Sequence, residues 1–158
     1  MKDKFKKAFM DVAERFAKLS SAKRAQVGAI IVKDNRIISI GYNGMPSGWD
    51  NDCEYYDAST IEDWMHPNDR EVYGKLISKP EVLHAETNAI AKVARSSESC
   101  EGAELFCTHL PCLDCAKLIY QSGISKVYYR VEYLAAKGAG KEFLEQSGVQ
   151  VERIESNG

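Results

Sequence analysis

Hydrophobic residues at the start of the chain recur every three or four positions. The members of this stripe are Phe5, Phe9, Val12, Phe16 and Leu19. This period predicts an amphipathic first helix. The polar positions between them are expected to stay in water and include Lys2, Lys6, Lys7 and Lys18.

A different pattern follows in residues 27–44, VGAIIVKDNRIISIGYNG, where two β-branched runs flank a polar tetrapeptide, Lys33 to Arg36. Such a pattern predicts an antiparallel hairpin. The next stretch, Met45 to Lys79, is rich in Gly, Pro, Asp and Asn. We interpret it as a long functional loop that contains a short helix.

Helical and extended patterns alternate in the second half of the chain. A helix from about Pro80 to Arg95 is followed by a strand at 103–110, a helix at 112–123, a strand at 125–133, a helix at 139–146 and a strand at 149–154. Right-handed crossovers would join these strands into one sheet with helices on both faces. With no linker or repeat in sight, we expect a single α/β domain over residues 1–158.

Composition narrows the range of functions. Lys and Arg number 21 against 23 Asp and Glu, a net charge of −2, so the chain lacks the basic field of most polynucleotide binders. A small ligand is the better expectation. Neither a transmembrane run nor a signal-peptide core is apparent, which favours the cytoplasm and no membrane partner. Five cysteines without a secretory context are expected to be reduced and to serve metal binding or catalysis.

Cys112 and Cys115, in LPCLDC, are spaced so that one helix face carries both thiols near its N-terminus. Alone, the pair fits half of a structural zinc site, a redox pair or part of a catalytic metal site. No second cysteine pair completes a structural site. The redox interpretation leaves another motif unexplained, the HAETNAI that begins at His84.

Joining the two motifs gives three zinc ligands, His84, Cys112 and Cys115, with the fourth position open to water that the ion acidifies. Glu86, two residues after the histidine, would stand beside that water as the catalytic proton shuttle. By itself, His84-x-Glu86 would be a charge pair at the start of a helix. The second motif makes the catalytic interpretation the stronger one.

The joint pattern H-A-E…P-C-x-x-C, together with QVGAIIV and IGYNGMPSG in this order, resembles the zinc-dependent cytidine and deoxycytidylate deaminases. The resemblance extends from about Ser20 to Ile154 and is closest to deoxycytidylate (dCMP) deaminases. It implies a three-layer α/β/α fold with a mixed five-stranded sheet. The implied reaction is hydrolysis of dCMP to dUMP and ammonia by a zinc-bound hydroxide, with Glu86 moving the protons.

The same resemblance implies substrate contacts at Asn43, Tyr133 and Pro111. Two of them have a plainer alternative: Asn43 would suit a turn and Tyr133 an edge strand. Lys23, Arg24 and Arg95 are candidates for the 5′-phosphate, although most such side chains are merely solvated. His109 could touch the site, but the family pattern does not require it.

Control is also implied by the resemblance. Related dCMP deaminases are commonly homohexamers, activated by dCTP and inhibited by dTTP, with Mg²⁺ accompanying the nucleotide. Candidates for that second site are Gly41, Tyr42, Asn43, Gly44, Met45 and Arg95. Some members carry a structural zinc, for which Cys53 and His66 alone are present here, so we expect one Zn²⁺ per chain. Cys100 and Cys107 are interpreted as packing residues.

Three rival functions share some of these features. A polynucleotide deaminase, such as one acting on tRNA adenosine, has both zinc motifs but disagrees with the acidic balance and GYNGMPSG. A nucleoside or riboflavin-pathway deaminase would differ in substrate. A regulatory subunit that keeps zinc without chemistry would not need Glu86.

Overall fold

The computed structural model describes residues 1–60, 74–132 and 140–156. Its main feature is a mixed five-stranded sheet of order β2-β1-β5-β6-β7, in which β1 is antiparallel to β2 and β5 while β6 is parallel to β5 and β7. The strands are β1 (Gly28–Lys33), β2 (Arg36–Tyr42), β5 (Glu104–His109), β6 (Lys126–Val131) and β7 (Gln150–Arg153).

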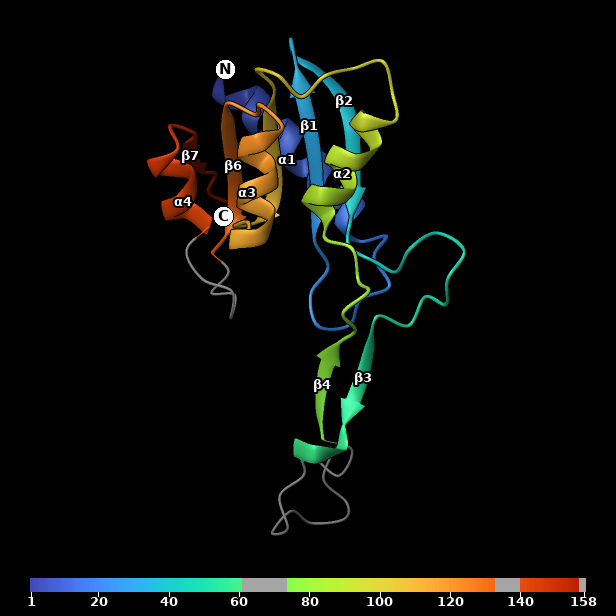
Figure 1. Ribbon diagram of the computed structural model, residues 1–158. Coiled ribbons are helices and arrows are strands. Elements are labelled where there is room, and N and C mark those ends of the chain that lie inside the picture. Colours follow the sequence, from blue (N-terminus) through green and yellow to red (C-terminus); the bar gives the residue numbers. More distant parts are fainter. Residues whose placement is uncertain (61–73, 133–139, 157–158) are drawn as a thin grey trace.

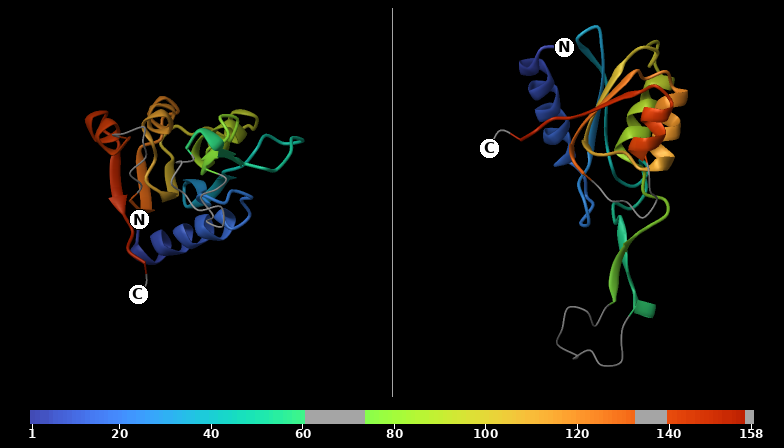
Figure 2. Two further views of the ribbon diagram at one scale, coloured as in Figure 1. Left: turned by 90° about the horizontal axis from the view of Figure 1, so that it is seen from below. Right: turned by 90° about the vertical axis from the view of Figure 1, so that its left-hand side faces the viewer.

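Helices cover both faces of this sheet (Figures 1 and 2). One face carries α1 (Asp3–Ala17), and the other carries α2 (Ala85–Ala94), α3 (Leu113–Gln121) and α4 (Gly140–Gln146). The predicted three-layer α/β/α architecture with a mixed five-stranded sheet is therefore confirmed. No helix in the described ranges is both long and apolar enough to span a membrane.

The predicted hairpin is present with a two-residue turn. Asp34 and Asn35 have φ values of 50° and 60°, which is the conformation that joins two twisted antiparallel strands most tightly. Short polar side chains tolerate this left-handed region better than the β-branched residues on either side. The turn thus sets the pairing of Lys33 with Arg36 and of Val32 with Ile37, and an irregularity between Ile31 and Val32 shifts the register beyond it.

The face of α1 that packs on the sheet overlaps the predicted stripe only in part, because Phe9 and Val12 pack partly buried against the core. Met10, Ala13 and Ala17 are its buried residues, whereas Phe5 and Leu19 are exposed. Gly28 on β1 explains this choice, because a Cβ there would lie 2.1 Å from the carbonyl oxygen of Ala13. The helix backbone approaches so closely that small residues occupy the contact.

Lys6 corrects a second expectation, since it does not stay in water. Its Nζ donates to Glu152 at 2.9 Å and lies over the ring of Tyr128. Lys126 makes the matching bond to Glu152 at 2.8 Å. The lysine therefore ties α1 to strands β6 and β7, which pattern reading of the helix alone could not reveal.

α2 begins at Ala85 and not near Pro80 as predicted. Leu83 explains the late start, because its N–H and C=O are both bonded to Gly44 in an isolated bridge. Residues held in such a bridge are extended and cannot join a helix. His84 consequently becomes the N-cap residue of α2.

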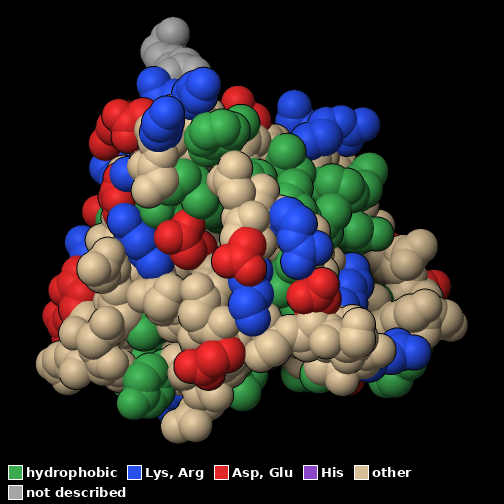
Figure 3. Space-filling model, turned by 90° about the horizontal axis from the view of Figure 1, so that it is seen from above, with side chains coloured by type: hydrophobic (Ala, Val, Ile, Leu, Met, Phe, Trp, Pro, Cys, Tyr) green, Lys and Arg blue, Asp and Glu red, His purple; other side chains and the backbone are tan. Residues whose placement is uncertain are grey.

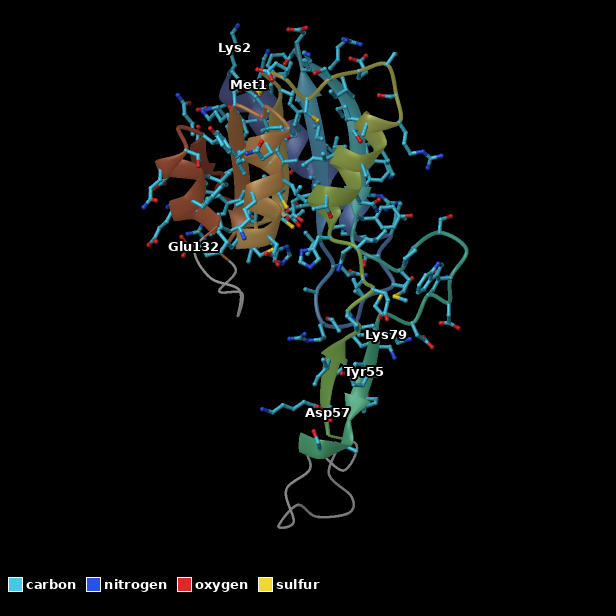
Figure 4. The ribbon with its side chains drawn as sticks, viewed as in Figure 1. Met1, Lys2, Tyr55, Asp57, Lys79 and Glu132 are labelled. Carbon is cyan, nitrogen blue, oxygen red and sulfur yellow. The ribbon has the colours of Figure 1, made fainter. Side chains whose placement is uncertain are left out.

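The segment predicted as a long loop contains an arm that projects from the body of the molecule (Figures 1 and 4). Its elements are β3 (Glu54–Asp57), a single 3₁₀ turn η1 (Ala58–Thr60) and β4 (Lys75–Ser78). The antiparallel β3–β4 pair was not predicted, and residues 61–73 of the range in which we expected a short helix lie outside the described residues. At the end of the molecule opposite the arm, acidic and basic side chains are interspersed (Figure 3).

Candidate active site

Two helices begin side by side near the carboxyl end of β5, the central strand of the main sheet. α3 follows the carboxyl end of β5, and α2 packs against it. The N-cap residues are His84 for α2 and Cys112 for α3, and neither side chain caps its own helix. Both side chains thus lie in the positive field of the two helix N-termini without serving as caps.

His84, Cys112 and Cys115 bring their ligand atoms within 4.8 Å of one another. The Nδ1 of His84 lies 3.2 Å from Cys115 Sγ and 3.7 Å from Cys112 Sγ. Tetrahedral zinc with bonds of about 2.0–2.3 Å separates neighbouring ligand atoms by about 3.5–3.8 Å. The spacing fits this ion. The two sulfurs are buried while His84 is exposed, so one side of the group stays accessible.

The protonation of the two thiols supports the same assignment. A hydrogen bond from Cys115, aided by His84, lowers the pKa of Cys112 to about 4. The same bond and burial raise the pKa of Cys115. The pair thus gives up its first proton readily and retains its second. A dication supplies the charge that would release the second proton as well.

Glu86 lies beside this group and is only 4% exposed. Within the described ranges, its side-chain hydrogen-bond contacts are two sulfur atoms: Cys107 Sγ at 3.0 Å from Oε1 and Cys115 Sγ at 3.6 Å from Oε2. Glu86 is not part of the ligand group. A carboxylate next to a metal group, but outside it, is suited to moving protons.

Cys107 was interpreted as a packing residue, and its contact with Glu86 was missed. The side chain is fully buried, and burial together with Glu86 raises its pKa well above the ordinary value, so it remains a thiol. The signal that could have found it is the alternation of β5, which directs residues 105 and 107 to the same face of the sheet.

A cavity of about 600 Å³ opens over the site, which is large enough for a nucleotide-sized ligand. His84, Glu86, His109 and Cys112 are among its lining residues, and Asn43 also lines it. Burial lowers the pKa of His109, whose Nδ1 is 2.9 Å from the hydroxyl of Thr108. The neutral form of this ring is therefore favoured in the cavity.

Two cations, Arg24 and Lys79, are also among the lining residues of the cavity. Arg24 donates to Ser78 Oγ at 3.3 Å, and its backbone N–H donates to Glu54 Oε1 at 3.1 Å. Lys79 lies where the arm joins the body (Figure 4). Lys79 was not predicted, because nothing local marks a loop lysine as facing a cavity.

Residues 3–131 match the family model described as the cytidine and deoxycytidylate deaminase zinc-binding region. The chain belongs to this deaminase family. The match includes His84, Glu86, Cys112 and Cys115 and nearly every element of the fold except α4 and β7. The expected family is thereby confirmed.

Individual deaminases of the family are similar over most of the chain. Deoxycytidylate deaminase of Enterobacteria phage T4 is 37% identical, over 80% of this chain and 77% of its own length. The human deoxycytidylate deaminase is 40% identical over 77% of this chain, which spans 61% of that enzyme. The dCMP deaminase of cyanophage S-TIM5, solved in complex with dCMP and dUMP, is 45% identical with a TM-score of 0.79, covering 98% of this chain and 99% of its own.

Asn43 lines the cavity, and its side chain also forms hydrogen bonds within the protein. Its Oδ1 accepts from the N–H of Val27 and its Nδ2 donates to the carbonyl of Ala25, both at 2.8 Å. Asn43 does not have a positive φ, so the left-handed turn alternative does not account for it. The bonds leave one amide hydrogen and one lone pair for a ligand.

Other predicted positions lie away from the cavity or outside the described residues. Pro111 is buried and does not line the cavity, and its carbonyl faces Gly140 at the start of α4. Arg95 is exposed at the far end of α2 from His84, and Lys23 is not part of the cavity lining. Tyr133 and His66 lie outside the described residues.

Two glycines of GYNG have different surroundings. A Cβ on Gly41 would lie 2.3 Å from the carbonyl oxygen of Ala85, so the absence of a side chain serves the packing of α2 on β2. Gly44 has open space where a Cβ would stand, and its backbone forms the bridge to Leu83. The GYNG run therefore contacts the residues at the start of α2, through packing at Gly41 and backbone pairing at Gly44.

Proposed function

We propose that this chain hydrolyses dCMP to dUMP and ammonia with one zinc ion held by His84, Cys112 and Cys115. The observation that carries the proposal is the convergence of three ligand atoms and a buried carboxylate beside a nucleotide-sized cavity. The dCMP deaminase of S-TIM5, whose structure holds substrate and product, supports the choice of nucleotide.

The zinc ion would supply Lewis-acid chemistry that makes a water molecule acidic near neutral pH. Glu86 accepts the first proton of that water and passes it to N3 of the cytosine ring, which makes C4 more electrophilic. After oxygen adds to C4, Glu86 carries the second proton to the 4-amino group. That group leaves as ammonia, and the ring becomes uracil.

Arg24 is our proposed contact for the 5′-phosphate, and Lys79 is a second cation that lines the same cavity. A guanidinium binds phosphate through charge-assisted hydrogen bonds, and Ser78 and Glu54 already orient this residue. Asn43 remains the candidate for the sugar. Because the nucleoside lacks the phosphate, we expect dCMP to be deaminated far better than deoxycytidine.

Measuring ammonia release from dCMP, CMP, deoxycytidine and dCTP tests this assignment directly. Arg24→Gln should raise the KM for dCMP about tenfold or more and leave the rate on deoxycytidine unchanged. Lys23→Gln removes a neighbouring cation that is not part of the cavity lining and serves as the control. Equal efficiency on dCMP and deoxycytidine would refute the nucleotide assignment, and no release from any cytosine compound would refute deamination.

Regulation is the further part of the proposal: dCTP with Mg²⁺ activates, dTTP inhibits, and the chain works as a homohexamer. The Gly44–Leu83 bridge supports a link, because a nucleotide that moves residues 43–45 would pull on the residue before His84. Effectors must bind two conformations differently, so dCTP should lower and dTTP should raise the half-saturating dCMP concentration. Superimposable rate curves, or a smaller assembly by analytical ultracentrifugation, would refute this part.

A further inference from the structure

Cys107 lies in the centre of the main sheet, where a functional contact is easily overlooked. It is on β5, paired with Ala29 of β1 on one side and Tyr129 of β6 on the other. Its side chain belongs to the buried cluster under α2 and α3 and has no exposed surface. The thiol therefore approaches the active site from the sheet, on the side of α2 that packs against it.

The contact with Glu86 is a hydrogen bond of defined direction. The Sγ–Oε1 distance is 3.0 Å, which is short for a sulfur donor. A carboxylate can only accept, so the hydrogen comes from the thiol. A buried carboxylate without a donor would be costly, and this bond supplies one from a rigid strand.

The two sulfur contacts of Glu86 differ in kind. Cys115 belongs to the ligand group, and its Sγ lies 3.6 Å from Oε2. Cys107 is outside the ligand group, and its contact with Oε1 is shorter, at 3.0 Å. Among the described residues, Cys107 is therefore the side-chain donor to this carboxylate that has no place in the ligand group.

We propose that Cys107 is a positioning residue that fixes Oε1 of Glu86 and leaves Oε2, on the metal side, to carry the proton. The inference rests on the proposed role of Glu86 in deamination. It assigns different tasks to the two carboxylate oxygens. Oε1 is held by the sheet, while Oε2, next to Cys115, faces the reacting atoms.

Replacing the thiol tests this assignment in the zinc-loaded protein. Cys107→Val and Cys107→Ala both remove the donor, but the first makes the side chain larger and the second makes it smaller. Cys107→Ser restores a donor. Both donor-free variants should keep zinc and the wild-type KM for dCMP but lose about tenfold in kcat, the effect of one modest hydrogen bond. Cys107→Ser should recover to within about threefold of wild type.

Cys100→Val is the matched control, because it removes another buried thiol of the same cluster, in the connection that follows α2, the helix whose first turn carries Glu86. It should leave kcat unchanged. The inference is overturned if Cys107→Val and Cys107→Ala both match wild type, or if Cys107→Ser is as slow as they are. A general packing defect would slow Cys100→Val as well, which would also count against a specific role.

Infrared spectroscopy gives a readout that does not require activity. Subtracting the spectrum of Cys107→Val from that of wild type isolates the S–H stretching band of Cys107. In a Glu86→Gln background the same band should move to higher frequency, because a neutral amide oxygen is a weaker acceptor than a carboxylate. An unmoved band overturns the inference. A wild type that is inactive on dCMP would refute the proposed function and leave this result standing.

Discussion

Gly41→Ala is a severe test of how α2, the helix that carries Glu86, is held. The added Cβ would meet the carbonyl oxygen of Ala85 at 2.3 Å and the nitrogen of Ala89 at 2.7 Å, both backbone atoms that no rotamer change can move. Ordinary contact begins at 3.4 Å, so α2 must shift by about 1 Å. Overpacking of this kind costs about 1–3 kcal/mol of the free energy of unfolding.

For a chain of this length, that cost lowers Tm by about 3–10 °C. Urea unfolding and calorimetry measure it without any assumption about function. Gly44→Ala is the control, since it lies in the same GYNG run, has no positive φ and has open space for the Cβ. If the two variants were equally stable, the packing explanation for Gly41 would be wrong. In the active enzyme, a 1 Å displacement of Glu86 should also lower kcat by about 10²-fold.

Three further changes probe the metal, the proton shuttle and a surface network. Cys112→Ala should lose both zinc and activity, as metal analysis and ammonia release would show; retained zinc would move the metal site elsewhere. Glu86→Gln should keep zinc and bind dCMP yet lose about 10² to 10⁴ in kcat, and a rate within a few-fold of wild type would require another proton carrier. Bonds from Lys126 and Lys6 lower the pKa of Glu152, so its contribution is present at neutral pH and lost as pH falls through that lowered value. Glu152→Gln should therefore cost less than about 1 kcal/mol at pH 7, with the difference from wild type vanishing in acid in urea titrations.

The grouping of His84, Cys112 and Cys115 could be predicted because it depends on residue types and short spacings. His84, Cys112 and Cys115 are few and distinctive, and a thiol pair three residues apart already specifies one face of a helix. The order of the helices and strands around the main sheet could also be predicted, because long segments with a clear hydrophobic period indicate their secondary structure. The hairpin turn at Asp34 and Asn35 is specified by two adjacent residues.

Contacts between segments that are distant in the sequence could not be predicted, because no local pattern indicates them. Gly28 and Gly41 look alike in sequence, yet each is required because a particular helix backbone lies against it. The strands of the arm are four residues long, and their partners, such as Tyr55 and Ile77, are separated by a segment with no regular pattern. Cys107 resembles an ordinary buried cysteine until the fold places it against Glu86.

The spacing of the two motifs acquires a physical meaning once the helix starts are known. Cys112 at an N-cap and Cys115 three residues later converge on the same group, whereas Glu86, two residues after His84, does not enter it. Glu86 lies in the first turn of α2, two residues past the extended N-cap His84, and its side chain stays outside the ligand group. It is still close enough for Oε2 to lie 3.6 Å from Cys115 Sγ. One spacing thus brings a second sulfur into the group, and the other places a carboxylate beside the group but outside it, which suits the proton-carrying role proposed for Glu86.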